Sequence, residues 1–329
     1  MTGKRSYQYF YRYNICSIQF ECVMTPSLQH WLATALVVLT LAWWYRAALA
    51  RLAQRWLTHG SVRSIARYPV KGLSGERLAG VALAAGDAMP FDRRWGLVKV
   101  DASLPRWNAA RPEWRHKSGF HCAFNARAAL APLDPQFAPT ADGRSLMLAV
   151  SDRASGAELL APVALPLGSG EEGGSGAAER FFRAIVGDRS LRLVGSTTAT
   201  PFQLNNTSVA GRVLHLVSSS TVAACAKAFG VALTCERFRP NIVVDDLPPW
   251  CEFDWVADIL CIGDEVECRV LKRTVRCDAT CRHPLTGVED INVPSLLQKH
   301  FPQHGPYLGV YLEVIKGGVI REGDGVALS

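Results

Sequence analysis

The sequence contains no block of five or more consecutive Lys and Arg residues, and charged residues make up only 20% of it. The formal net charge of +7 is small for 329 residues, so nucleic acid is not an expected partner. There is also no P-loop, no His-Glu-x-x-His motif and no Gly-x-Ser-x-Gly motif. These absences exclude the sequence signatures of P-loop nucleotide sites, zinc proteases and serine hydrolases. No internal repeat is visible.

The ten cysteines are irregularly spaced along a long chain. Small secreted proteins that depend on disulfides are shorter and richer in cysteine, so we expect reduced thiols in a domain that faces the cytosol. Hydrophobic residues make up 49% of the chain, which is typical of a globular protein.

The N-terminal segment separates from the rest by its hydrophobicity. Residues 1–30 form a polar, aromatic tail, and residues 31–45 carry no charge. Fifteen helical residues span about 22 Å, whereas the bilayer core measures about 30 Å. Because Arg46 can reach the interface, we predict a transmembrane anchor over residues 31–50. A signal peptide cleaved after Ala50, a buried core helix and an amphipathic surface helix remain open alternatives.

The rest of the chain has mainly strand-like patterns. Residues 58–167 alternate apolar and polar residues between glycines, which indicates a small β-barrel or sandwich. Residues 168–176 have the composition of a flexible linker. Residues 177–329 predict a mixed domain rich in strands, with helices near 177–187, 220–230 and 294–301. The fold class is therefore α+β, dominated by strands.

The segment LKRTVRCDATCRHPLTG, residues 271–287, carries the most distinctive chemistry. Nearby cations lower the pKa of a thiol, so Cys277 beside Arg276 is a candidate metal ligand or nucleophile. A buried structural cysteine is the alternative. A zinc site of Cys268, Cys277, Cys281 and His283 is also conceivable, but only Cys277 and Cys281 have the usual ligand spacing.

Basic residues recur where three other strand-like segments begin or end. They lie in RYPVKG, residues 67–72, in FDRRWGLV, residues 91–98, and in ERFRPNIVVDD, residues 236–246. Arginine binds phosphate well because its guanidinium group donates two parallel hydrogen bonds. Each cluster alone is compatible with ordinary solvated surface. Together they indicate an anion site only if the fold brings them to one place.

These motifs, taken in order with LCIGDEVECRV and GVYLEV…GVIREGDGVAL, resemble the MOSC family and above all its amidoxime-reducing members. The resemblance extends over roughly residues 60–328. It implies an N-terminal β-barrel-like MOSC-associated domain over residues 58–167 and a MOSC β-barrel with a few helices over residues 177–329. Both would follow the membrane helix.

The resemblance implies that the Cys277 thiolate binds the metal of a molybdenum cofactor, whose molybdopterin supplies the other sulfur ligands. Lys71 and Arg93 match residues that bind the pterin phosphate, and Gly72 stands where a serine is usual, so only its backbone N–H can contribute. Arg239 and Asn241 match residues that contact the pterin. The remaining matched positions are Val275, which replaces a usual serine, Arg276 and Tyr311. Cys281 stands where threonine is common, and we expect it to be a bystander.

The function implied is reduction of N-hydroxylated compounds, such as amidoximes and hydroxylamines, to amidines and amines. Electrons would come from NADH through a flavin reductase and a b-type cytochrome, with the enzyme anchored in a membrane and facing the cytosol. In a eukaryote that membrane would be the mitochondrial outer membrane. Residues 101–126 depart from the family's usual loop, so the substrate stays open. The alternatives are a cofactor or sulfur carrier and a non-catalytic membrane-tethered β-protein with structural zinc.

Overall fold

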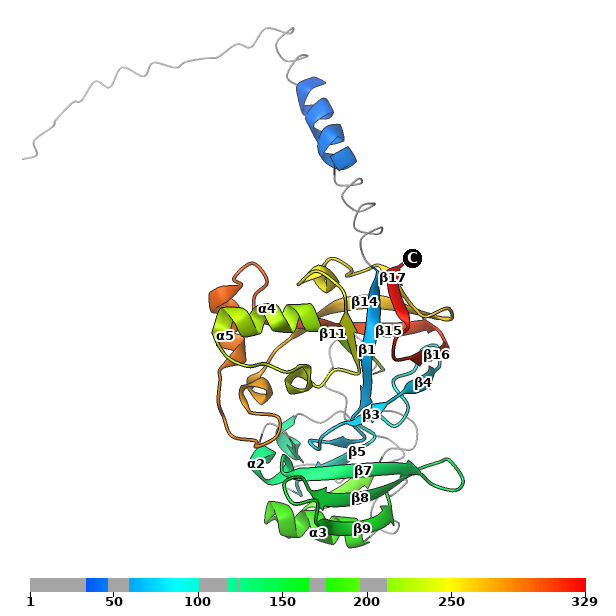
Figure 1. The fold of residues 1–329 in the computed structure, drawn as a ribbon, viewed down its shortest axis with the longest axis vertical. Coiled ribbons are helices and arrows are strands. Elements are labelled where there is room, and N and C mark those ends of the chain that lie inside the picture. The colour runs from blue at the N-terminus through cyan, green and yellow to red at the C-terminus, as the bar shows by residue number, and fades with distance from the viewer. Residues whose placement is uncertain (1–33, 47–58, 101–116, 123–124, 166–175, 196–211) are drawn as a thin grey trace, which may run out of the picture. The chain divides into compact units, whose positions relative to one another are not determined.

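Seven strands from both halves of the chain close into a β-barrel (Figure 1). The structure, a computed structural model, describes residues 34–46, 59–100, 117–122, 125–165, 176–195 and 212–329. The hydrogen-bonded order β12-β11-β15-β14-β13-β17-β1 closes because β1 also pairs with β12. These strands are β1 (Gly60–Arg67), β11 (Leu214–Ser218), β12 (Ile242–Asp245), β13 (Ile259–Ile262), β14 (Val266–Val275), β15 (Tyr307–Lys316) and β17 (Gly325–Leu328).

Side chains from alternate positions of the long strand β14 help to fill the barrel. In β14, Val266, Cys268 and Val270 are buried, whereas the residues between them are more accessible. Successive side chains on a strand point to opposite faces, so every second residue enters the interior. The interior is therefore apolar, and the polar chemistry of the barrel must come from its ends.

The first half of the chain supplies smaller sheets. One contains β2 (Val70–Lys71), β5 (Trp95–Val98), β6 (Phe120–His121) and β10 (Arg192–Gly195). A second contains β7 (Leu133–Pro139), β8 (Leu146–Asp152) and β9 (Glu158–Ala164). β4 (Gly80–Leu83) pairs with β16 (Gly318–Arg321), and β3 (Glu76–Leu78) pairs with β1 outside the barrel.

These sheets correct the prediction of an N-terminal β-barrel. Among the described residues, the strands of segment 58–167 do not close on themselves. The reason is that β1, the longest of them, pairs with β12 and β17 and so completes the barrel of the second half. Residues 55–329 form one compact unit. The predicted bounds of two domains within it remain a prediction.

The helices agree with the sequence pattern to within one or two residues. α3 (Gly176–Val186) packs Ala178 and Phe182 against the smaller sheets. α4 (Ser219–Phe229) and α5 (Val293–His300) pack together beside the barrel (Figure 1). The short helices are α2 (Arg127–Leu130), η1 (Lys117–Gly119), η2 (Cys235–Phe238), η3 (Cys251–Phe253) and η4 (Asp278–Cys281).

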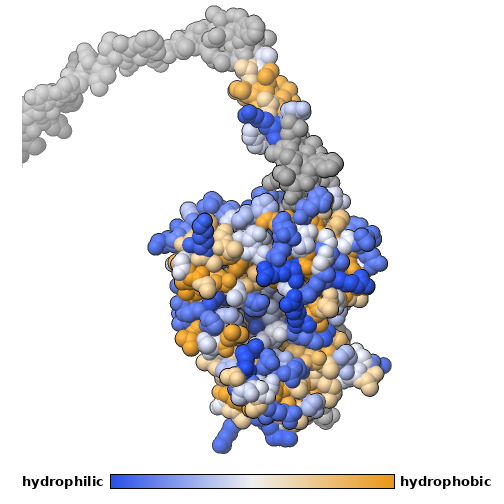
Figure 2. Space-filling model, in the orientation of Figure 1, coloured by the Kyte–Doolittle hydropathy of each residue, from blue (hydrophilic) through white to orange (hydrophobic). Residues whose placement is uncertain are grey.

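Residues 1–54 form a separate unit, of which residues 34–46 are described and helical. Figure 2 shows hydrophobic side chains on the surface of this helix. Its large exposed side chains include Leu36, Leu39 and Trp43. In the described part of the chain no helix has the length and apolar character needed to cross a bilayer. Residues 31–33 and 47–50 of the predicted anchor lie outside the described residues.

Candidate functional site at the rim of the barrel

Several strand ends meet at one rim of the barrel. β1 runs antiparallel to β12, so the end of β1 lies beside the start of β12. β11 runs parallel to β12 and therefore begins at the same rim. β14 ends at Val275, which pairs with Tyr307 at the start of β15. Because β15 is antiparallel to β11, this strand end lies toward the end of β11. The segment after β14 reaches the residues that precede β12, where Arg276 donates to the Phe238 carbonyl. The rim therefore receives residues that are more than 200 positions apart in the sequence.

Cys277 leaves the barrel at this rim, two residues after β14 ends. Its carbonyl oxygen accepts hydrogen bonds from the Thr280 N–H at 2.9 Å and the Thr280 hydroxyl at 2.8 Å, which fix the first turn of η4. The cysteine is partly accessible. It lies within electrostatic range of Lys71, Arg276 and Tyr311, because its thiolate raises the pKa of each of those groups. The thiol therefore lies near three of the predicted cofactor-binding residues.

Lys71 reaches the site from the first half of the chain. Burial, together with the guanidinium groups of Arg93 and Arg239, lowers the pKa of Lys71 to about 8. The thiolates of Cys122 and Cys277 act in the opposite direction on the same pKa. The Lys71 ammonium also lies 5.4 Å from the centre of the Phe120 ring. Three cations are thus gathered around a point where an anion would be stabilised.

Arg93 and Arg239 are held on opposite sides of Tyr68, which we call the Arg93–Tyr68–Arg239 stack. The two guanidinium carbons lie 4.5 Å and 4.3 Å from the centre of the Tyr68 ring. Arg93 Nη2 donates to the Arg239 carbonyl at 3.1 Å. Both arginines have positive φ angles, 48° and 53°, which non-glycine residues rarely adopt. The surrounding contacts therefore fix a backbone arrangement that costs energy.

Asp92 anchors this stack from within the core. Its side chain is fully buried. One carboxylate oxygen accepts from the Tyr68 N–H at 2.7 Å and the other accepts from Arg93 Nη1 at 2.5 Å. The bonds fix the ring and one guanidinium group relative to each other.

The guanidinium group of Arg276, next to Cys277, makes its hydrogen bonds within the protein. Its Nε and Nη2 donate to the Leu308 carbonyl at 2.9 and 2.7 Å, and Nη1 donates to the Phe238 carbonyl at 3.3 Å. Burial lowers the pKa of Arg276 to about 10, still well above neutral pH. Arg276 therefore remains a cation, and its hydrogen bonds secure the start of β15 and the end of η2.

Arg276 also determines the protonation of the buried His215. Arg276 Nη2 lies 2.5 Å from His215 Nε2, and an arginine can only donate, so Nε2 is the acceptor. His215 Nδ1 then carries the proton and faces the Arg239 carbonyl at 3.5 Å. Burial and the charge of Arg276 lower the pKa of His215 well below its usual value. His215 is therefore neutral and supports the backbone of Arg239.

Asn241 has a different arrangement from the one its matched role implies. Its side-chain oxygen accepts from the His215 N–H at 3.0 Å, and its amide nitrogen donates to the Ala66 carbonyl at 3.1 Å. The side chain thus links β1 to β11 at the rim, and its polar atoms are largely occupied by the backbone.

Gly72 is required by its surroundings. Its φ angle is +101°, and a Cβ atom there would lie 2.8 Å from the Cα of Cys122.

Tyr311 on β15 pairs with His215 on β11, with 5.6 Å between their ring centres. Burial raises the pKa of the Tyr311 hydroxyl. Val275 is 60% exposed and lies on the outer face of the rim.

The structure does not bring the zinc quartet together. Cys268 lies inside the barrel, where burial raises the pKa of its thiol to about 12, whereas Cys277 lies beyond the strand. Cys281 is buried, with its sulfur 3.9 Å from the Asn292 side-chain oxygen. Within the described ranges, no group of three or more His, Cys, Asp and Glu residues is placed to hold a metal ion.

Sequence reasoning missed Tyr68, Asp92, His215 and Cys122. Tyr68 and Asp92 lie in the motifs RYPVKG and FDRRWGLV, but the predicted site did not include them. His215 is a single histidine in an apolar strand, for which a buried core residue is the ordinary interpretation.

Comparison with known proteins finds similarities in the second half of the chain. Residues 203–327 match the MOSC domain. The chain is 32% identical over 123 residues to mitochondrial amidoxime reducing component 2 of Rattus norvegicus, an alignment that covers 34% of this chain and 36% of that protein. The chain thus matches about a third of the length of this relative.

Two bacterial crystal structures are also similar. YuaD of Bacillus subtilis has a TM-score of 0.36 and 8% identity, covering 82% of this chain and 96% of that one. YiiM of Geobacillus stearothermophilus has a TM-score of 0.26 and 21% identity, covering 35% and 53%. The matched segment contains six of the seven barrel strands, and β1 completes the barrel from outside it. The similarity to the MOSC domain is thus confined to residues 203–327, which hold most of the barrel.

Proposed function

We propose that this protein is a molybdenum-cofactor-dependent oxidoreductase that reduces N-hydroxylated compounds to amines and amidines. The observation that carries the proposal is the position of the Cys277 thiol at the barrel rim, within electrostatic range of Lys71 and next to Arg276. The similarity to an amidoxime reducing component supports the choice of reaction.

The residues present fit such a cofactor. A metal held by one cysteine needs further ligands, and the described residues offer no His, Cys, Asp and Glu cluster to supply them. A cofactor that carries its own sulfur ligands would supply the ligands that the protein lacks. A soft thiolate suits such a sulfur-rich metal centre. The cations of Lys71, Arg93 and Arg239 match the phosphate of molybdopterin in charge.

Each residue then has a physical role. Cys277 supplies the protein's metal ligand, and Lys71 and Arg93 bind the phosphate. The Tyr311 hydroxyl keeps its proton because burial raises its pKa, so it can donate a hydrogen bond at the site. Arg239 contacts the pterin, whereas Asn241 and Arg276 position the backbone around it.

When bound, the cofactor supplies a metal that exchanges two electrons and accepts the oxygen atom of an N–O bond. The overall reaction consumes two electrons and two protons, breaks the N–O bond and releases water. We propose NADH as the electron source, with a flavin reductase and a b-type cytochrome as partners. We also propose that residues 31–50 anchor the protein in a membrane with its catalytic part facing the cytosol, at the mitochondrial outer membrane in a eukaryote.

The test is elemental analysis of the full chain, purified from a host that makes the molybdenum cofactor, followed by an assay. We expect about one molybdenum per chain and NADH-dependent reduction of benzamidoxime when the reductase and the cytochrome are added. Molybdenum without turnover would favour a cofactor or sulfur carrier. Zinc without molybdenum would favour a structural zinc protein and contradict the proposal.

A further inference from the structure

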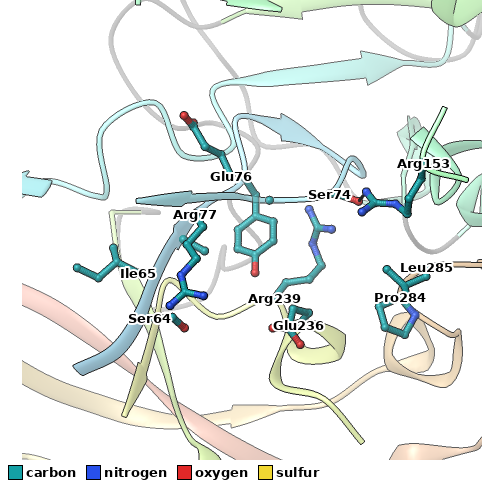
Figure 3. Close-up of a pocket in the computed structure, with 13 residues that line it drawn as sticks. Ser64, Ile65, Ser74, Glu76, Arg77, Arg153, Glu236, Arg239, Pro284 and Leu285 are labelled. Atoms are coloured by element: carbon teal, nitrogen blue, oxygen red, sulfur yellow. Dashed lines mark hydrogen bonds between the residues drawn. The ribbon is translucent and has the colours of Figure 1, made fainter. Parts of the chain in front are cut away.

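A pocket of about 190 Å³ lies beside the rim and shares Tyr68 and Arg239 with it. Figure 3 shows Arg239 between Arg77 and the turn that carries Pro284 and Leu285. Cys277 and Lys71 do not line this pocket. The pocket therefore extends beyond the proposed cofactor site, with which it shares Arg239.

The Tyr68 hydroxyl is the feature that points to a ligand. The residue is only 4% exposed, and its hydroxyl makes no hydrogen bond to any described residue. Its ring is fixed between two guanidinium groups, so the hydroxyl cannot turn away to find a partner. Because Tyr68 lines the pocket, a ligand acceptor there could take the hydrogen of this hydroxyl and gain a hydrogen bond.

The pocket offers mostly hydrogen-bond donors. Burial raises the pKa of Tyr68 to about 12, so the hydroxyl stays protonated and donates. Ser64 and Ser74 contribute hydroxyl groups, and the Ser74 oxygen already accepts from Arg153 at 2.9 Å, which leaves its hydrogen to donate. Arg239 adds a cation. Ligands rich in acceptors and negatively charged therefore fit this side of the pocket.

The opposite wall is apolar, and one of the two acidic residues that line the pocket is already paired. Pro284 and Leu285 form that wall. Glu76 is paired with Arg67 at 2.7 Å. Glu236 is exposed and lies beside Arg239 in Figure 3. A flat apolar group can pack on Pro284 and Leu285 while its charged end reaches Tyr68 and Arg239.

We propose that this pocket binds a small aromatic carboxylate, with the carboxylate on the Tyr68 hydroxyl and the Arg239 guanidinium and the ring against Pro284 and Leu285. The site is independent of the proposed redox reaction, because its residues are present whether or not a cofactor is bound. Its occupant shares Arg239 with the cofactor site, so binding in one place will alter affinity in the other.

The experiment measures benzoate binding to the full chain by isothermal titration calorimetry, with benzamide as the uncharged comparison. Tyr68→Phe removes the hydroxyl and keeps the ring between the arginines. We expect it to weaken benzoate roughly tenfold, since a hydrogen bond to a charged group is lost. Tyr307→Phe, at an exposed tyrosine outside the pocket, is the matched control and leaves affinity unchanged.

Glu236→Gln tests the charge of the ligand and, being exposed, is expected to fold normally. Removing this negative charge should tighten benzoate binding about twofold, whereas a cationic ligand such as benzamidine would bind more weakly. The proposal is overturned if benzoate does not bind, if Tyr68→Phe binds as well as the parent, or if Lys71→Met alone abolishes binding. These outcomes do not depend on molybdenum content, so they are distinguishable from failure of the proposed function.

Discussion

Cysteine has different chemistry in the interior of the barrel and at its rim. β14 and the residues just after it contain one cysteine of each kind. Cys268 lies inside among apolar side chains, where burial raises the pKa of its thiol to about 12. Cys277, just beyond the strand, is partly accessible and lies near Lys71 and Arg276. A thiol surrounded by apolar groups is inert, whereas one beside cations can ionise and bind metal. Position relative to the strand end, more than residue type, determines the chemistry.

The largest effect should come from exchanging each of these thiols for a hydroxyl. Loss of groups that merely support metal ligands often costs about 10–100-fold in activity. We therefore expect Cys277→Ser to lose more than about a hundredfold in turnover of benzamidoxime and to lose its molybdenum.

Cys268→Ser is the interior counterpart. It buries a hydroxyl in an apolar environment, so we expect a loss of roughly 1–3 kcal/mol in unfolding free energy with turnover per folded molecule unchanged. Molybdenum content and urea unfolding of the two variants, measured side by side, check this pair. Equal turnover in Cys277→Ser and the parent protein would contradict the site assignment.

Arg276 tests whether the rim depends on buried donors. In Arg276→Met, the Leu308 and Phe238 carbonyls and His215 lose their common donor. We expect the unfolding free energy to fall by about 2–4 kcal/mol, because each buried acceptor left unpaired costs energy.

The control for Arg276→Met is Arg282→Met, which removes an exposed pair with Glu289 at 3.4 Å. Exposed ion pairs contribute roughly 0–1 kcal/mol, so this variant should be close to the parent in urea unfolding. If both variants lose the same small amount, the buried arginine is not the support of the rim that its hydrogen bonds indicate.

The sequence located the charged groups of the site better than the groups that hold them. Cys277, Lys71 and Arg93 were identified because the resemblance marks them in short motifs. The stacking role of Tyr68 and the link that Asn241 makes between β1 and β11 depend on contacts between distant segments. Such contacts leave no local pattern. Closure of the barrel by β1 was missed for the same reason, since Ile65 pairs with Ile242 across most of the chain.

Gly72 allows the packing at the edge of the rim to be compared with that of an open loop. The resemblance implies a serine at this position, yet this glycine has a φ of +101° and lies against the Cα of Cys122. We expect Gly72→Ser to destabilise the protein by about 1–3 kcal/mol through backbone strain and this close contact. Gly86→Ser is a matched control, because Gly86 also has positive φ but nothing lies within 4 Å of its Cβ position. Thermal unfolding should show a larger loss at residue 72; a smaller loss there would mean that the loop adjusts easily.

Glu252 is an exception to the apolar interior, because it is a fully buried carboxyl next to α4. One oxygen accepts from the Thr221 hydroxyl at 2.9 Å, and the other has no partner among the residues that the structure describes. Burial raises the pKa of Glu252 to about 7 from its usual 4.5, so the folded protein holds a proton that the unfolded chain releases between those values.

The contribution of Glu252 to stability is therefore fully present below about pH 4.5 and is lost as the pH rises through about 7. Glu252→Gln cannot ionise, so it should be about 1–2 kcal/mol more stable than the parent at pH 8 and nearly equal to it at pH 5. Glu289→Gln, at a side chain 66% exposed, should leave the difference between the two pH values unchanged. Urea unfolding at both pH values measures the effect. If Glu252→Gln instead loses stability equally at both, the carboxyl is ionised and partnered in the folded protein, and the interior of this molecule tolerates charge as its rim does.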